Sequence, residues 1–236
     1  MPASPLTLSS WHLPSQWQVA ERLRIERAVL VLSKVIGSSG ERYVSAIAEA
    51  FERLKARDIQ LTASNSGGSV SDNRVTVRVL NRTAVVDLRA GTVAWDDGTA
   101  PEDTLKVILL HYLLGADGRI DGEWMSFREF ESGNLYYSVF HGRALVQLIS
   151  AFGSDPARLV APSVKLGGTR VERGDVSFDF LFFPNLKMNI TIWKGDDEVP
   201  ASANILFDAA AGRILGAEDL AHLAEDIAET LERLAT

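Results

Sequence analysis

Apolar residues recur at helical spacing over two stretches near the N-terminus of the chain. In the second stretch, which begins at Glu41, they lie three and four residues apart: Val44, Ile47, Phe51 and Leu54. Residues at these spacings share one face of a helix and leave the charged residues to the solvent. The sequence therefore predicts a surface arm over residues 1–15, rich in Ser and Pro, followed by a helical segment over residues 16–62.

The next segment, residues 63–73, is made largely of Ser, Gly and Asn. A segment with almost no apolar side chains to bury cannot offset the entropy that ordering costs. We therefore expect a flexible loop at 63–73, which would separate the helical segment from a domain over residues 74–236.

Alternating apolar and polar residues predict β-strands in two later regions. The first region gives a small antiparallel meander over residues 75–95. The second gives a hairpin, Val176–Phe183 and Leu186–Trp193, which turns at Pro184 and Asn185. In its second strand Leu186, Met188, Ile190 and Ile192 alternate with Lys187, Asn189, Thr191 and Trp193. One face of this strand is expected to be buried and the other to be wetter.

Helical patterns separate and follow these strands. Thr99 and Glu102 resemble a capping box that opens one helix, two further helices are expected over residues 134–152 and 156–164, and a last helix begins near Ala217. Strands and helices therefore come in blocks rather than in strict alternation. This order favours an α+β fold with antiparallel sheet regions packed by helices, and it leaves room for two lobes.

Composition removes several classes of function. The 236 residues include no cysteine, which excludes thiolate metal sites, iron–sulfur clusters held by this chain, disulfides and cysteine nucleophiles. A net charge of −7 argues against a nucleic-acid partner, because binding phosphates requires clustered Lys and Arg. We find neither a secretory leader nor a membrane-spanning stretch, and we expect a cytoplasmic protein.

Trp124, Phe127, Arg128 and Glu129 form the first candidate site. A guanidinium among aromatic rings can bind a carboxylate or phosphate in a partly dry pocket, whereas the alternative is a core aromatic cluster with structural ion pairs. If residues 124–130 formed a strand, Arg128 and Glu129 would point to opposite faces and would not pair.

A second candidate is the turn after the strand that ends at Trp193. Its carboxylates, Asp196 and Asp197 with Glu198, could hold a hard cation, but acidic turn residues are commonly solvated or bonded to backbone amides, and no metal site is assigned. The loop over residues 117–123 has a faint resemblance to a calcium loop, which fails because Arg119 and Arg128 stand where oxygen ligands are needed. Asp175, Asp179 and Asp208 could form a carboxylate pair only if the fold brought them together.

His111 and His141 lie in apolar helical stretches, and either could ligate a haem or a corrinoid. His141 is the stronger candidate, because Tyr137 and Arg143 could frame a flat cofactor that carries carboxylates. A lone helical histidine is nevertheless more often structural. No cofactor is assigned by the sequence.

A series of short blocks resembles a bacterial and archaeal family that is described only as a domain of unknown function. The blocks are Trp124–Phe130 with Gly133 and Tyr137, Leu166–Gly168 with Gly174 and Asp175, Trp193–Ala201, Leu206–Asp208, and Glu218–Leu220. The resemblance covers roughly residues 105–225. Some members resemble fusions to iron–sulfur modules, which implies a setting in anaerobic redox or corrinoid-linked one-carbon metabolism. The resemblance implies no catalytic residues.

Three functions remain open on this evidence. The first is an accessory protein that binds a small ligand or a protein partner, with the segments 124–129 and 193–197 lining the site. The second is a carboxylate-dependent enzyme acting on a small anionic substrate, with or without a divalent cation. The third is a tetrapyrrole or corrinoid binder. The apolar stripe of the last helix could pack internally or against a second copy, so a homo-oligomer also remains open.

Overall fold

The structure is a computed structural model that describes residues 39–236. Residues Ser45–Thr236 form one compact unit, which contains every strand found in the described part of the chain. The arm expected over residues 1–15 and the first expected helix lie outside the described residues. The helix expected from Glu41 is present as α2, Ser39–Lys55.

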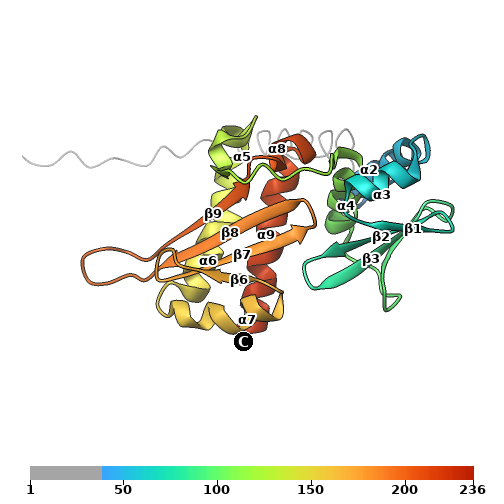
Figure 1. The fold of residues 1–236 in the computed structure, drawn as a ribbon. Helices are drawn as coiled ribbons and strands as arrows, with labels where there is room; N and C mark the ends of the chain where they lie inside the picture. Colours follow the sequence, from blue (N-terminus) through green and yellow to red (C-terminus); the bar gives the residue numbers. More distant parts are fainter. Residues whose placement is uncertain (1–38) are drawn as a thin grey trace, which may run out of the picture. The chain divides into compact units, whose positions relative to one another are not determined.

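A four-stranded antiparallel sheet follows the first helices (Figure 1). Helix α3 spans Ile59–Asn65, and the strands are β1 (Ser69–Ser71), β2 (Arg74–Val79), β3 (Arg82–Asp87) and β4 (Thr92–Trp95), in spatial order β1-β2-β3-β4. This is the expected meander with one additional strand. Successive residues of β2 and β3 alternate between the two faces of the sheet, so that Val75, Val77, Val79, Ala84 and Val86 are buried and the residues between them are more exposed.

The additional strand corrects the expectation of a flexible loop at 63–73. These residues instead complete α3 and form β1, which pairs with β2. The polar pair Asp72 and Asn73 has φ values of 48° and 63°, the left-handed conformation that a two-residue hairpin turn needs. Backbone hydrogen bonds to a neighbouring strand therefore order a segment that has few apolar side chains.

The second sheet is five-stranded and antiparallel, in spatial order β5-β9-β8-β7-β6. Its strands are β5 (Trp124–Ser126), β6 (Thr169–Val171), β7 (Val176–Phe183), β8 (Leu186–Trp193) and β9 (Ser202–Asp208). The hairpin of β7 and β8 has the bounds that the sequence predicts. An α+β fold with antiparallel sheets is thereby confirmed.

Helices cover one face of the second sheet, with α6 and α9 lying along it (Figure 1). The helices are α4 (Asp103–Gly115), α5 (Gly133–Phe140), a π-helical segment (His141–Leu145), α6 (Val146–Phe152), α7 (Val160–Lys165), α8 (Ala211–Ile214) and α9 (Ala217–Ala235). Short 3-10 helices occupy Phe127–Glu129 and Pro156–Leu159. Within the described part of the chain, no helix has both the length and the apolar character needed to cross a membrane.

Both sheets contribute to one continuous hydrophobic core. Helix α4 is apolar on nearly all sides and is buried within this core. Its Tyr112 stacks on Phe183 of β7 at 4.2 Å and donates a hydrogen bond to the Ser66 carbonyl. The expected capping box at its start is absent, because Glu102 makes no side-chain cap and the Thr99 hydroxyl donates to Asp97 instead.

The outer face of β8 differs from the sequence expectation. The four apolar residues are buried as predicted, but Asn189 and Thr191 on the opposite face are also buried, at 1% and 0% exposure. The side-chain amide of Asn189 donates hydrogen bonds to Asp179 and Ser177. The Thr191 hydroxyl donates to the side-chain oxygen of Asn189. Polar residues are stable here because they satisfy one another across the strands.

Candidate functional site

The segment Trp124–Phe130 is a strand only as far as Ser126, after which Phe127–Glu129 forms a 3-10 turn. Phe127 is buried and stacks on Phe140 at 4.2 Å, so it belongs to the core. Trp124 is half-buried, and the Lys187 ammonium lies 5.8 Å from its ring. A strand over 124–130 is therefore wrong, since the turn redirects the chain toward α5.

Arg128 and Glu129 do not pair with each other. The Arg128 guanidinium lies 3.5 Å from the ring centroid of Tyr137, a cation–π contact on the surface. Glu129 accepts a hydrogen bond from the backbone N–H of Ser126 at 2.6 Å. The hydroxyl and N–H of Ser126 together hold the pKa of Glu129 below its ordinary value.

The remaining residues of this region form an exposed strip along α5 and the π-helical segment. The His141 ring lies 5.8 Å from the Tyr137 ring, and Arg143 forms an ion pair with Glu225 at 3.2 Å. His141 is exposed. The strip therefore brings Arg128, Tyr137 and His141 together on an exposed surface of the described residues.

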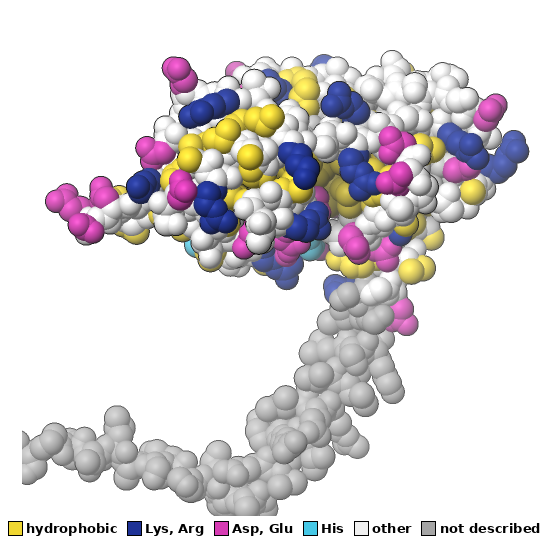
Figure 2. Space-filling view, turned by 90° about the horizontal axis from the view of Figure 1, so that it is seen from below, with side chains coloured by type: hydrophobic (Ala, Val, Ile, Leu, Met, Phe, Trp, Pro, Cys, Tyr) yellow, Lys and Arg dark blue, Asp and Glu magenta, His cyan; other side chains and the backbone are white. Residues whose placement is uncertain are grey.

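The turn after Trp193 lies at the tip of a projecting hairpin, where acidic side chains gather (Figure 2). Asp196 accepts hydrogen bonds from the N–H groups of Glu198 and Val199, which hold its pKa below the ordinary value. Asp197 is exposed. Asp196 therefore shapes the turn. On the face shown in Figure 2, basic side chains are interspersed with acidic and apolar ones.

The two predicted segments do not line a common site. Trp124 lies beside Lys187, and Trp193 is six residues further along β8. At about 3.3 Å per residue, the two tryptophans are separated by about 20 Å. Trp124 and Trp193 thus lie near opposite ends of the sheet.

Two of the three aspartates considered for a carboxylate pair, Asp179 and Asp208, are also far apart. Asp179 and Asp208 are two strands apart and offset along the strands, which places them about 12 Å from each other. Asp175 accepts from the Lys194 N–H at 2.6 Å. Across residues 39–236 no group of three or more His, Asp or Glu side chains is arranged to hold a metal ion.

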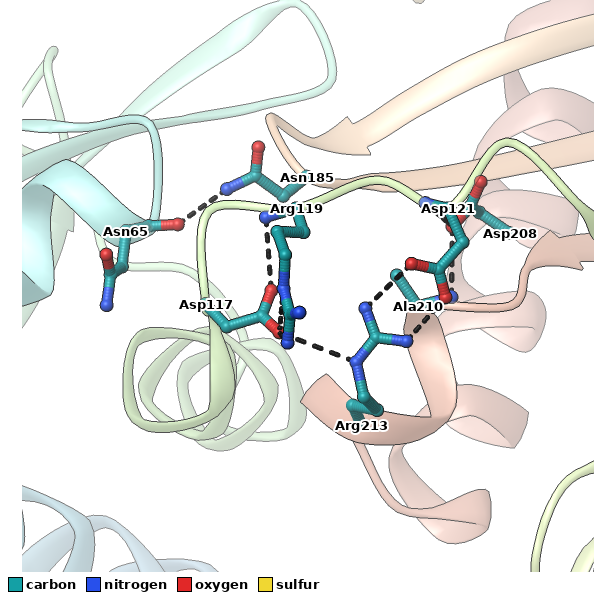
Figure 3. A network of polar contacts seen from close by, with 8 residues as sticks. All are labelled: Asn65, Asp117, Arg119, Asp121, Asn185, Asp208, Ala210 and Arg213. Atoms are coloured by element: carbon teal, nitrogen blue, oxygen red, sulfur yellow. Dashed lines mark hydrogen bonds and ion pairs between the residues drawn. The ribbon is translucent and has the colours of Figure 1, made fainter.

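The loop over residues 117–123 is held by a polar network (Figure 3). Arg213 forms ion pairs with Asp117 and Asp121 on the exposed side of the loop. On the buried side, the Asp208 carboxylate accepts hydrogen bonds from the N–H groups of Asp121, Gly122 and Ala210. The loop is therefore a structural connection between α4 and β5.

A cavity of about 520 Å³ lies where the β2–β3 turn, the segment before α4 and the C-terminal half of α9 meet. Half of its lining residues are polar or charged, and these groups make up most of the exposed surface of its walls. The lining residues are Val79, Leu80, Asn81, Arg82, Trp95, Thr99, Ala100, Pro101, Glu102, Leu105, Leu166, Phe182, Asp226, Glu229, Thr230 and Arg233. A hollow in which several polar groups converge is a candidate for a small-molecule site.

Helix α9 supplies one polar wall of this cavity. Asp226, Glu229, Thr230 and Arg233 are spaced three, four and seven residues from the first of them, so they share one face of the helix. The adjacent face carries Leu223, Ile227 and Leu231, which are buried in the core. Packing of the apolar face therefore directs the polar face into the cavity.

Asp226 is the most perturbed acid of the cavity. It accepts no hydrogen bond and forms no ion pair with any residue from 39 to 236. Burial is the largest of the effects that raise the pKa of Asp226 to about 6; the nearby carboxylates of Glu229, Glu225 and Glu102 act in the same direction, and Arg233 opposes them. A half-buried carboxyl without a partner at a cavity wall, as found here among residues 39–236, is a feature that often marks a functional site.

Arg82 and Trp95 also line the cavity. The Arg82 guanidinium lies 4.0 Å from the Trp95 ring centroid and 3.0 Å from the Asp97 carboxylate. Arg82 is thus neutralised by its own partners. Arg233 forms no ion pair within the described chain and donates only a long hydrogen bond, 3.4 Å, to Thr230.

Sequence patterns did not identify this cavity, because its residues come from segments far apart in the chain. One signal was present in α9. Asp226 follows Leu223 by three residues and precedes Thr230 by four, which places it at the border of the apolar stripe rather than on the solvent side. A carboxylate at such a border must be paired, protonated or adjacent to a cavity.

Among the other histidines, His111 of α4 bonds to Asp219 of α9 at 2.8 Å, and His222 lies 3.2 Å from Glu225. The hydrogen bond to Asp219 raises the pKa of His111, against the effect of burial. Asp219 and Glu49 favour its protonation and Arg53 disfavours it. His111 therefore joins two helices rather than facing an open ligand position.

Asp219→Asn is expected to lower stability at acid pH more than at alkaline pH. The charged pair stabilises the fold below the unfolded pKa of histidine, about 6.5, and this contribution is lost as the pH rises through the raised folded value. The loss is at most about 1 kcal/mol, because solvent screens the partly exposed pair. Urea unfolding at about pH 5.5 and about pH 8.5 measures it, with Asp103→Asn as the control. Equal losses at both pH values would contradict this role.

Comparison with known families adds one finding. A family model described as "Domain of unknown function (DUF3786)" matches residues 58–230. The match begins well before the blocks that carry the resemblance and includes both sheets. No curated protein and no solved structure matches the chain.

Proposed function

Because the chain belongs to this family of unknown function, we propose its function from geometry: it binds a small organic molecule in the cavity beside α9, as a binding protein rather than an enzyme. The observation that carries the proposal is the Asp226 carboxyl, which faces the cavity without a partner. A polar group is retained at such a position at a cost in stability, which binding of a ligand would offset.

The size of the cavity supports a small ligand. A volume of about 520 Å³ falls within the range of roughly 300–1,000 Å³ typical of small-molecule pockets. Leu105, Leu166 and Phe182 form the floor of the cavity but are themselves almost fully buried, so a ligand would contact mainly polar groups, such as Asp226 and Arg233. Contacts of this kind fix the orientation of a ligand.

Binding without turnover fits the residues that line the cavity. The lining contains no Ser, His, Lys or Tyr, and its Thr230 hydroxyl accepts a hydrogen bond from Arg233, a contact that does not activate it as a nucleophile. A carboxylate-dependent enzyme is the second candidate, favoured by one observation: a pKa of about 6 suits Asp226 to general acid–base catalysis. Turnover of a bound ligand, lost in Asp226→Asn, would favour this alternative.

Asp226→Asn is expected to weaken ligand binding and to stabilise the protein. Because the folded pKa of Asp226 lies above its unfolded value, stability falls as the pH rises from about 4 to about 6, and the deficit persists above that. The amide avoids this cost, so the variant should be about 1–2 kcal/mol more stable at neutral pH and equal to the wild type near pH 4. Urea unfolding across this pH range measures the difference.

The matched control is Asp72→Asn, at an exposed turn position whose left-handed backbone suits Asn. It should change neither the pH dependence nor binding. Binding is measured with a panel of small amines, acids and neutral compounds, followed through the NMR signals of the Leu105 and Leu166 methyl groups. Ala100→Trp, which fills the cavity from a loop, should abolish those changes. Ligands that still bind to Ala100→Trp would place the site elsewhere.

A further inference from the structure

We infer that the ligand of this cavity is a small zwitterion with one ammonium and one carboxylate group, as in an amino acid. This inference rests on the proposed function and specifies the chemical class of its ligand. It follows from which charged groups of the cavity are already paired and which are not.

Three carboxylates of the cavity have no partner among the described residues. Asp226 and Glu229 project from α9, and Glu102 stands at the N-cap of α4 without using its side chain as a cap. An ammonium group carries three N–H donors and no acceptor. It is therefore complementary to this end of the cavity.

One guanidinium of the cavity is also without a carboxylate. Side chains of a helix lean toward its N-terminus, and the hydrogen bond from Arg233 to Thr230 shows that Arg233 follows this rule. Its guanidinium is thereby turned back along α9, in the direction of Asp226. Arg82 does not compete for the same ligand group, because Asp97 and the Trp95 ring already hold it.

The balance of charge selects between ligand classes. With Arg82 and Asp97 paired, three carboxylates and one guanidinium remain at the cavity. A ligand with only a carboxylate would meet repulsion from Asp226, Glu229 and Glu102, and a ligand with only an ammonium would leave Arg233 unpaired and facing a positive charge. A zwitterion satisfies both sets of groups.

Protonation of Asp226 should oppose binding of the ammonium group. The charged groups around Asp226 are Glu229, Glu225 and Arg233 of α9 and Glu102 of the segment before α4. Ionised Asp226 accepts a hydrogen bond from an ammonium group and attracts its positive charge, whereas the protonated acid carries no negative charge. Affinity for a zwitterion should therefore rise as the pH increases through about 6.

Four compounds with the same phenyl ring test the inference: phenylalanine, phenethylamine, hydrocinnamate and phenethyl alcohol. Titration of the full chain is followed through the methyl signals of Leu105 and Leu166 and the carboxyl signal of Asp226. Phenylalanine should bind about tenfold more tightly than phenethylamine, which should in turn exceed the alcohol, and hydrocinnamate should bind most weakly.

Two variants separate the ends of the ligand. Asp226→Asn should weaken the binding of phenylalanine and of phenethylamine by a similar factor, about tenfold, and should remove the pH dependence of their affinities. Arg233→Gln should reduce the affinity for phenylalanine to that for phenethylamine, and should leave the affinity for phenethylamine no weaker. Asp72→Asn should leave all four affinities unchanged.

The outcomes distinguish the inference from the function on which it rests. If hydrocinnamate or phenethyl alcohol binds in the cavity as tightly as phenylalanine, the protein is a small-molecule binder but the zwitterion inference is wrong. If Arg233→Gln affects phenylalanine and phenethylamine equally, the assignment of the carboxylate end is wrong. If none of the compounds changes the signals of Leu105 or Leu166, both the inference and the proposed function are overturned.

Discussion

Replacement of Asp208 by Ala is expected to lower the free energy of unfolding by about 3 kcal/mol, a large change for a single side chain. Asp208 is 2% exposed, and its carboxylate accepts hydrogen bonds from three backbone N–H groups, those of Asp121, Gly122 and Ala210, at 2.9, 2.7 and 2.9 Å. Alanine leaves these donors without a protein acceptor. Each unpaired buried donor costs about 1–3 kcal/mol, reduced where water enters the space.

A graded set of variants measures this effect. Asp208→Asn keeps one acceptor oxygen but presents an NH₂ group to one donor, so it should cost less, about 1–2 kcal/mol. Thermal unfolding should show a fall in the melting temperature of about 10 °C for Asp208→Ala. Hydrogen exchange at the Gly122 amide should accelerate in both variants, because this N–H donates to Asp208.

The control lies on the exposed side of the same loop. Arg213→Gln removes the ion pairs to Asp117 and Asp121, which are partly exposed to solvent and should contribute less than about 1 kcal/mol. If Arg213→Gln destabilised the protein as much as Asp208→Ala, the surface network rather than the buried carboxylate would hold the loop.

The sequence predicted those parts of the fold that depend on local periodicity. The hairpin of β7 and β8 was predicted with its bounds because alternation continues without interruption from Leu186 to Trp193. The same rule failed for Asn189 and Thr191, since an alternating pattern identifies polar residues but not the partners that allow them to be buried. Segment 63–73 was missed for a related reason. Its order comes from pairing with β2, while its composition alone resembles a loop.

The candidate site was less accessible to sequence reasoning than the fold. Trp124 and Arg128 attracted attention because aromatic and charged residues cluster there in sequence, yet the structure uses Arg128 on the Tyr137 ring at the surface. The cavity instead brings together Arg82 and Asp226, which are far apart along the chain. Such a site depends on tertiary packing, so periodicity can indicate only single anomalies, such as a carboxylate at the border of an apolar stripe.

Gly133→Ala is expected to destabilise the protein by about 3 kcal/mol, through overlap rather than through loss of a contact. Gly133 begins α5 directly beneath the 3-10 turn at Phe127–Glu129. A Cβ at this position would overlap the backbone carbonyl oxygen of Phe127. Because the obstruction is backbone and Phe127 is fixed by its stacking on Phe140, the turn cannot yield without moving the core.

Gly142→Ala is the matched control, at a glycine in the π-helical segment that continues α5. A Cβ at Gly142 meets no atom within 4 Å, and the residue is exposed. Alanine should therefore stabilise the protein by about 0.5 kcal/mol, because glycine loses more backbone entropy in a helix. Urea unfolding of both variants tests the opposite signs. If both substitutions changed the free energy of unfolding by a similar amount, the close fit beneath Phe127 would not be the reason for glycine at position 133.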